Sequence, residues 1–209
     1  MRRLLVILGR LFGIISLKYG FYYKYSRLIR FLLEKQYAPR SIRKYSSLSQ
    51  LSNFFYECKW KADPWWRDVI SYPARAEKSQ NDTGYLGDCD EFAAYAASAI
   101  GGMGLKDIDS ISILTVTYIG KPWTDYYISG HNVCVFRYKD EDGHWWWANM
   151  SNWRRGKVVW RDDYGRRFGS PAEVATWITT RKSGTSIGWA RVSNDLKTVY
   201  GYGVVPERM

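Results

Sequence analysis

The sequence predicts an α+β protein with one core domain over residues 46–209, preceded by a basic helical arm over residues 1–45. Three observations support this fold class. Helical patterns come first along the chain, segments rich in β-branched and aromatic residues follow, and 46% of the residues are hydrophobic. Such a chain can bury a sizeable core, and runs of helices followed by runs of strands are typical of α+β folds.

A small-residue helix is predicted over residues 91–100, where apolar side chains recur at helical spacing on an Ala-rich stretch. The pair Gly101-Gly102 predicts its end, because glycine accepts the left-handed conformation of a helix C-cap. This helix is expected to pack tightly against a sheet.

Strand signals begin after this helix. Residues 110–119, 131–138 and 145–149 are β-branched or aromatic and alternate in polarity, and a turn at 140–143 separates the last two. We expect neighbouring antiparallel strands. A cap and capping box at Ser170 and Glu173, with Pro171 at the first helical position, predict a short helix reaching about Thr180. The C-terminal tail is expected to add one or two edge strands.

The segments before the Ala-rich helix carry weaker signals. Residues 37–53 are interpreted as a connector or a short helix. Residues 61–84, with Pro64 and Pro73, are expected to be mostly loop with one helical turn, and this loop contains the adjacent Trp65 and Trp66.

The positive charge is concentrated at the N-terminus. Residues 1–45 hold 11 Lys and Arg and one acid, a net +10, whereas residues 46–209 hold 20 and 19, a net +1. Since the folded part is nearly neutral, a nucleic-acid-binding surface is not favoured. The apolar run at 4–17 is shorter than the roughly 20 residues of a membrane span. The arm is interpreted as a secretory signal, a basic amphipathic helix on an anionic membrane, or a helix packed on the domain.

Three cysteines, Cys58, Cys89 and Cys134, fit neither a disulfide framework nor a zinc site, because none are at CxxC spacing and the chain has two histidines. Cys89 stands at the start of the Ala-rich helix, where backbone N–H groups and the helix dipole favour a thiolate, although Asp88 and Asp90 oppose that effect. This position predicts a sulfur that a substrate can reach.

His131 and Asn149 are the candidate partners of Cys89. A nucleophilic cysteine needs a base, and the base needs an acceptor that orients its ring. His131 opens one predicted strand and Asn149 closes the next, so an antiparallel hairpin would bring them to one rim of the sheet. Cys134 lies three residues beyond His131, so alternation predicts that it lies on the opposite sheet face.

The segments GDCDEFA, SGHNVCVF and HWWWANMSNW resemble the transglutaminase-like superfamily, including the bacterial transglutaminase-like cysteine peptidases, over residues 63–153. The resemblance implies a papain-like core in which Cys89 is the nucleophile, His131 the base and Asn149 the third member, where the superfamily usually has Asp. It also implies an oxyanion hole made by the Cys89 N–H and an upstream side chain, for which Gln80, Asn81, Trp65 and Trp66 are candidates.

The resemblance implies a cysteine peptidase or amidase that cleaves an amide bond through an acyl-enzyme, with a protein or peptide substrate; amine capture of the acyl-enzyme would give a transglutaminase. The alternative is an inactive transglutaminase-like module that binds a peptide or glycan in a Trp-rich cleft. No cofactor is expected, although Asp88 and Asp90 match positions that hold calcium in some members. A cytoplasmic or peripheral membrane location is favoured over secretion.

Overall fold

An antiparallel sheet forms the middle layer of the protein. The computed structural model describes residues 43–62, 70–119, 128–152, 156–182, 185–193 and 198–203. Within these residues, five strands pair in the order β5-β4-β3-β6-β7. Their bounds are Ile108–Ile119 for β3, Ile128–Lys139 for β4, Trp145–Met150 for β5, Thr185–Ser193 for β6 and Val199–Gly203 for β7. The α+β class and the antiparallel sheet predicted from the sequence are therefore confirmed.

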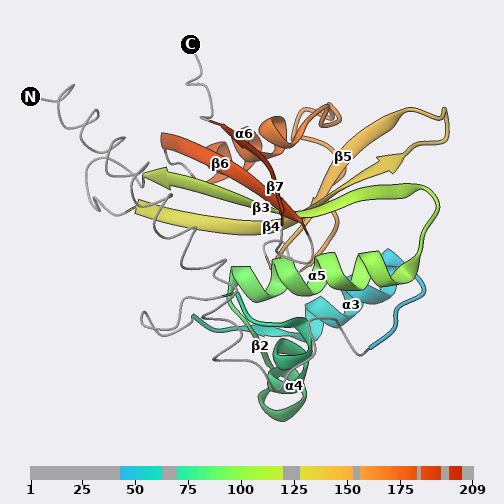
Figure 1. Ribbon diagram of the computed structural model, residues 1–209, viewed down its shortest axis with the longest axis vertical. Coiled ribbons are helices and arrows are strands. Elements are labelled where there is room, and N and C mark those ends of the chain that lie inside the picture. The colour runs from blue at the N-terminus through green and yellow to red at the C-terminus, as the bar shows by residue number, and fades with distance from the viewer. Residues whose placement is uncertain are drawn as a thin grey trace, which may run out of the picture.

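Helices cover both faces of this sheet (Figure 1). Helix α5, Cys89–Met103, packs on one face together with α3, Leu48–Glu57, and helix α6, Pro171–Arg181, packs on the other. Each face has its own cluster of buried apolar side chains, so the sheet separates two cores.

Strand β4 contributes to both cores by alternation. Cys134 and Phe136 belong to the cluster under α5, whereas Val133 and Val135 belong to the cluster under α6. Successive side chains of a strand point to opposite faces. Even-numbered residues of β4 therefore face α5, and odd-numbered residues face α6.

The described N-terminal elements pack around α5. After α3 come a two-residue strand β1, Lys59–Trp60, helix α4, Pro73–Thr83, and strand β2, Tyr85–Gly87, which pairs parallel with β1. Helix α3 starts at a Ser47 cap, whose side chain accepts a hydrogen bond from the Gln50 N–H at 3.2 Å. Strand β2 leads through Asp88 into α5, so it fixes where α5 begins.

Three sequence-based boundaries are corrected by the structure. The segment before β2 holds the 11-residue helix α4 rather than one helical turn, with Pro73 at its first position. Helix α5 continues through Gly101 and Gly102 and ends at Gly104, which is left-handed with φ of 63°. Strand β6 is not an edge strand, because it pairs with β3 on one side and β7 on the other. The predicted start of α6 at the Ser170 cap is confirmed.

Several predictions lie outside the described residues. The basic arm is described only from residue 43 onward, and Trp65 and Trp66 fall in the undescribed 63–69 segment. Among the helices that the structure does describe, none is both long and apolar enough to cross a membrane.

Candidate functional site

Cys89 is the first residue of α5, as the sequence predicted. Asp88 is the N-cap, and its carboxylate accepts a hydrogen bond from the Asp90 N–H at 2.8 Å. Glu91 completes a capping box, since its Oε2 accepts from the Asp88 N–H at 3.1 Å. These bonds fix the helix start, so the position of the Cys89 backbone is firmly determined.

Glu91 also holds the segment that precedes α4. It is 3% exposed, and its Oε1 accepts a hydrogen bond from the Ser71 N–H at 3.0 Å. Gly87 makes room for this side chain. It has a φ of 141°, and a Cβ at this position would lie 2.6 Å from the Glu91 Cγ. The glycine of the GDC segment is therefore required by the capping carboxylate beneath it.

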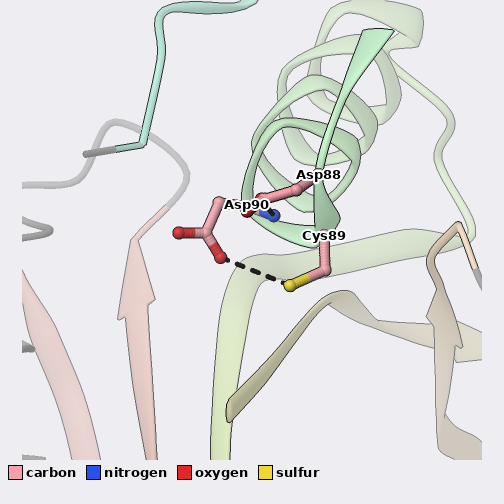
Figure 2. Close-up of side chains that lie close together, drawn as sticks. All are labelled: Asp88, Cys89 and Asp90. Carbon is pink, nitrogen blue, oxygen red and sulfur yellow. Dashed lines mark hydrogen bonds between the residues drawn. The ribbon is translucent and has the colours of Figure 1, made fainter. Parts of the chain in front are cut away.

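The Cys89 sulfur points toward a carboxylate. The Cys89 Sγ donates to the Asp90 Oδ1 at 3.5 Å, as Figure 2 shows. Asp90 is 2% exposed, and the same oxygen accepts a hydrogen bond from the Asn132 Nδ2 of β4. A carboxylate acceptor stabilises the protonated thiol relative to the thiolate, because a second negative charge beside it is unfavourable. The Asp90 contact therefore opposes the effect of the helix N-terminus on this sulfur.

His131 lies on the other side of the sheet. As an odd-numbered residue of β4, it shares a face with Val133 and Val135, and it pairs with Val116 of the α6-side cluster. Burial lowers the pKa of His131 to about 3, with a further lowering from the Lys182 ammonium at the end of α6 and an opposing effect from Asp90. The imidazole is therefore neutral at physiological pH.

Asn149 shares the α6 side with His131 but not its position along the sheet. Asn149 of β5 pairs with Val135, four residues beyond His131. Four residues of strand span about 13 Å. The hairpin register therefore differs from the one expected, in which residues 131 and 149 lie opposite each other.

The structure consequently does not assemble the predicted triad. Cys89 lies on the α5 side, whereas His131 and Asn149 lie on the α6 side and are separated along the strands. Cys134 lies on the opposite face from His131, as predicted, and this places it in the core beneath α5. The residue that β4 presents to the N-terminus of α5 is Asn132, which the sequence reasoning missed. Its position beside the candidate base, as a polar residue in an apolar strand, was the available signal.

The upstream candidates for an oxyanion hole lie on α4. The Asn81 Oδ1 accepts a hydrogen bond from an Arg43 guanidinium nitrogen at 3.4 Å. The Gln80 Oε1 is buried and has no hydrogen-bond partner among the described residues. The Asn81 contact does not involve Cys89, and neither side chain is assigned to the oxyanion hole.

Two groups of side chains bring metal-ligand atoms close together. Asp88, Cys89 and Asp90 form one, and Asp140, Asp142 and His144 form the other. Asp88 and Asp90 in the first group and Asp140 in the second already accept hydrogen bonds from the protein. Calcium requires 6–8 oxygen ligands. Neither group supplies such a set.

The α6 side of the molecule carries an aromatic and arginine-rich surface. The turn at 162–168 and α6 enclose a cavity of about 270 Å³, lined by Tyr164, Phe168 and Trp177 together with acidic and basic side chains. Exposed aromatic side chains elsewhere in the C-terminal half include those of Trp145, Trp160 and Tyr200. We refer to Trp145, Trp147, Trp177, Tyr164, Tyr200 and the arginines over their rings as the aromatic–arginine face.

No family model matches the chain, and no curated protein or solved structure is similar enough to match it.

Proposed function

We propose that this chain is a ligand-binding module that keeps a transglutaminase-like arrangement of helix and sheet without thiol catalysis, and that it holds a peptide or glycan. The observation that carries this proposal is the separation of Cys89 from His131 by the central sheet. A base that faces the opposite core cannot accept the thiol proton, because general-base catalysis requires hydrogen-bond reach.

Two further observations support a binding role. The Cys89 thiol donates to Asp90, an acceptor that opposes thiolate formation. Within the aromatic–arginine face, the rings of Trp145, Tyr164 and Tyr200 are exposed, and aromatic and arginine side chains are enriched at recognition surfaces. The ligand is therefore placed on the α6 side of the sheet, away from the sulfur.

A second candidate is the cysteine peptidase or amidase that the resemblance implies. It is favoured by the position of Cys89, which is half-buried at the N-terminus of a 15-residue helix. In that reaction the Cys89 thiolate attacks an amide carbonyl, His131 takes the thiol proton and returns it to the leaving amine, and water resolves the acyl-enzyme. This candidate requires His131 to reach the α5 side, which the register of β4 does not provide.

Alkylation of Cys89 distinguishes the two candidates. The rate of iodoacetamide modification at pH 6 is measured by peptide mass spectrometry in the wild type and in His131→Gln, with His144→Gln as the control for loss of an exposed histidine. The binding proposal expects a slow reaction with equal rates in all three proteins. A fast wild-type reaction that His131→Gln abolishes would overturn it in favour of the enzyme.

The basic arm suggests that the protein also binds a membrane surface. We propose that residues 1–45 lie on an anionic membrane surface, because their net charge is +10 while the rest of the chain is nearly neutral. Co-sedimentation with phosphatidylserine-containing vesicles should be lost when residues 1–35 are deleted. Unchanged sedimentation after the deletion would contradict membrane binding by these residues.

A further inference from the structure

Arginine guanidinium groups lie over aromatic rings at several places in the described residues. The pairs are Arg43 with Phe54, Arg137 with Trp145, Arg166 with Tyr164, Arg167 with Trp146, Arg181 with Trp177, and Arg191 with both Trp147 and Tyr200. The Arg191 Cζ lies 4.9 Å from the Trp147 ring centroid and 4.8 Å from that of Tyr200. Arg191 is therefore the one arginine in this set whose guanidinium contacts two rings.

Arg191 differs in its charge balance from the other arginines that lie over aromatic rings. Arg43, Arg137, Arg166, Arg167 and Arg181 each form an ion pair with a carboxylate, which belongs to Glu77, Asp109, Asp162, Asp140 and Asp163 respectively. Among the described residues, no carboxylate lies within ion-pair distance of Arg191. Its cross-strand neighbours, Leu114 of β3 and Gly201 of β7, carry no charge.

Within the described residues, the surroundings of Arg191 supply no negative charge to balance its guanidinium. The side chain is partly buried, and burial lowers the pKa of Arg191, with a further lowering from Arg137 and an opposing effect from Tyr200. A ring quadrupole attracts a cation but supplies no negative charge. A guanidinium in this position gains most from an anion that arrives with a ligand.

We propose that Arg191 is the recognition residue for a carboxylate of an acidic peptide that binds the aromatic–arginine face. The inference rests on the proposed binding function and names its ligand class. The guanidinium is planar and presents paired N–H donors that match a carboxylate in a bidentate arrangement. The guanidinium already lies against the rings of Trp147 and Tyr200, so it loses less side-chain entropy on binding than a free arginine would.

A neutral glycan fits this site less well than an acidic peptide. Sugars are recognised through stacking on free aromatic faces, but the rings of Trp147 and Tyr200 already lie against the guanidinium, and Trp147 is 9% exposed. The neighbouring Trp145 ring is likewise occupied by Arg137 at 4.7 Å. The group that this site offers to a ligand is therefore the Arg191 cation rather than an aromatic ring face.

Fluorescence anisotropy with two labelled decapeptides tests the proposal, one alternating Gly and Glu and the other alternating Gly and Gln. The proteins are the full chain, Arg191→Gln, Arg191→Lys and Arg43→Gln, at physiological salt. Arg43→Gln is the matched control, because it removes the same charge and the same kind of ring contact on the α3 side. The wild type should prefer the Glu peptide. Arg191→Gln should weaken that binding by about tenfold or more, the loss of a charge-assisted bond.

The variants separate specific recognition from general attraction of anions by a basic chain. Arg43→Gln should change the affinity less than twofold. Arg191→Lys keeps the charge but should still weaken binding, because an ammonium lacks the planar donor pair. Equal losses in Arg191→Gln and Arg43→Gln, or equal binding of both peptides by the wild type, would overturn the proposal. Thermal unfolding of each variant shows whether a loss of peptide affinity comes from a loss of folding stability. If Arg191→Gln is destabilised, the affinity of Arg191→Lys is compared with that of the wild type instead.

The titration is repeated in Cys89→Ser, so its result is independent of thiol chemistry. If Cys89 proves catalytic while the Arg191 effect persists, the proposed function fails and the carboxylate site stands. If Cys89 proves inert and the Arg191 effect is absent, the carboxylate site fails and the proposed function stands.

Discussion

His131 and Asn132 are adjacent in β4 and point into different cores. Asn132 donates a hydrogen bond to Asp90 at the start of α5, whereas His131 shares the α6 side with Val133 and Val135. This one-residue difference decides which side chain meets the α5 N-terminus. It also makes Asp90 and Asn132, rather than Cys89 and His131, the polar pair that joins helix to sheet.

The Asp90–Asn132 pair should contribute to stability. Asn132→Ala removes one hydrogen bond to a carboxylate that is 2% exposed, and a hydrogen bond to a charged group contributes about 1.5–3 kcal/mol. Urea unfolding measures the change. Asn149→Ala is the control: it is equally buried, but its Nδ2 has no hydrogen-bond partner among the described residues, so the loss should be smaller. Equal losses of unfolding free energy in the two variants would show that the Asp90–Asn132 hydrogen bond does not contribute to stability.

Glu91 and Glu173 close the caps of two helices in different surroundings. Glu91→Ala would leave the N–H groups of Asp88 and Ser71 without this carboxylate in a buried setting, so we expect a loss of about 2–4 kcal/mol. Glu173 is exposed and accepts from the Gly169 N–H at 2.9 Å, so Glu173→Ala should cost about 1 kcal/mol or less. The two midpoints in a urea titration compare them directly, and a larger loss for Glu173→Ala would be inconsistent with the capping account.

Glycine substitutions should have opposite effects at Gly87 and Gly102. Gly87→Ala places a Cβ against the Glu91 side chain in a backbone conformation with positive φ, so we expect strong destabilisation. Gly102 lies within α5 with open space around it, so Gly102→Ala should stabilise by about 0.5–1 kcal/mol. Thermal melts of the two variants measure both changes. A neutral Gly87→Ala would mean that the segment before Cys89 is not constrained as described.

Burial of His131 should make the protein less stable in acid. Its folded pKa is about 3 and its ordinary value is 6.5, so between these values the unfolded chain holds a proton that the folded chain lacks. Stability due to the neutral imidazole is complete above pH 6.5 and falls as the pH drops toward 3, by about 1.4 kcal/mol per unit. His131→Gln should flatten this slope, and His144→Gln should leave it unchanged. Identical slopes in all three proteins would contradict the buried position.

The sequence predicted the helices and strands better than it predicted which side of the sheet each strand residue faces. The helix that begins at Cys89, the cap at Ser170 and the strands around residues 110–119, 131–138 and 145–149 follow from local patterns, and the structure contains them. The face of His131 does not follow from such a pattern. Both parities of β4 carry apolar residues, because helices cover the sheet on both sides, and alternation then cannot tell which parity meets α5.

The register of the β4–β5 hairpin could not be predicted from the sequence either. Lys139 pairs with Trp145 around the 140–144 turn, where Asp140 accepts bonds from the N–H groups of Asp142 and His144. This turn sets Val135, not His131, opposite Asn149. A turn of this kind is fixed by side-chain acceptors that composition alone does not rank.

The ionisation of His131 in the presence and absence of the Cys89 sulfur tests the central claim most directly. Imidazole resonances of the wild type and of Cys89→Ser are followed by NMR from pH 8 to pH 4, with His144 as the internal reference for an exposed ring. We predict that the His131 ring stays neutral through this range and that its resonances are the same in both proteins. An imidazolium at neutral pH in the wild type that disappears in Cys89→Ser would reveal a thiolate–imidazolium pair and contradict the account.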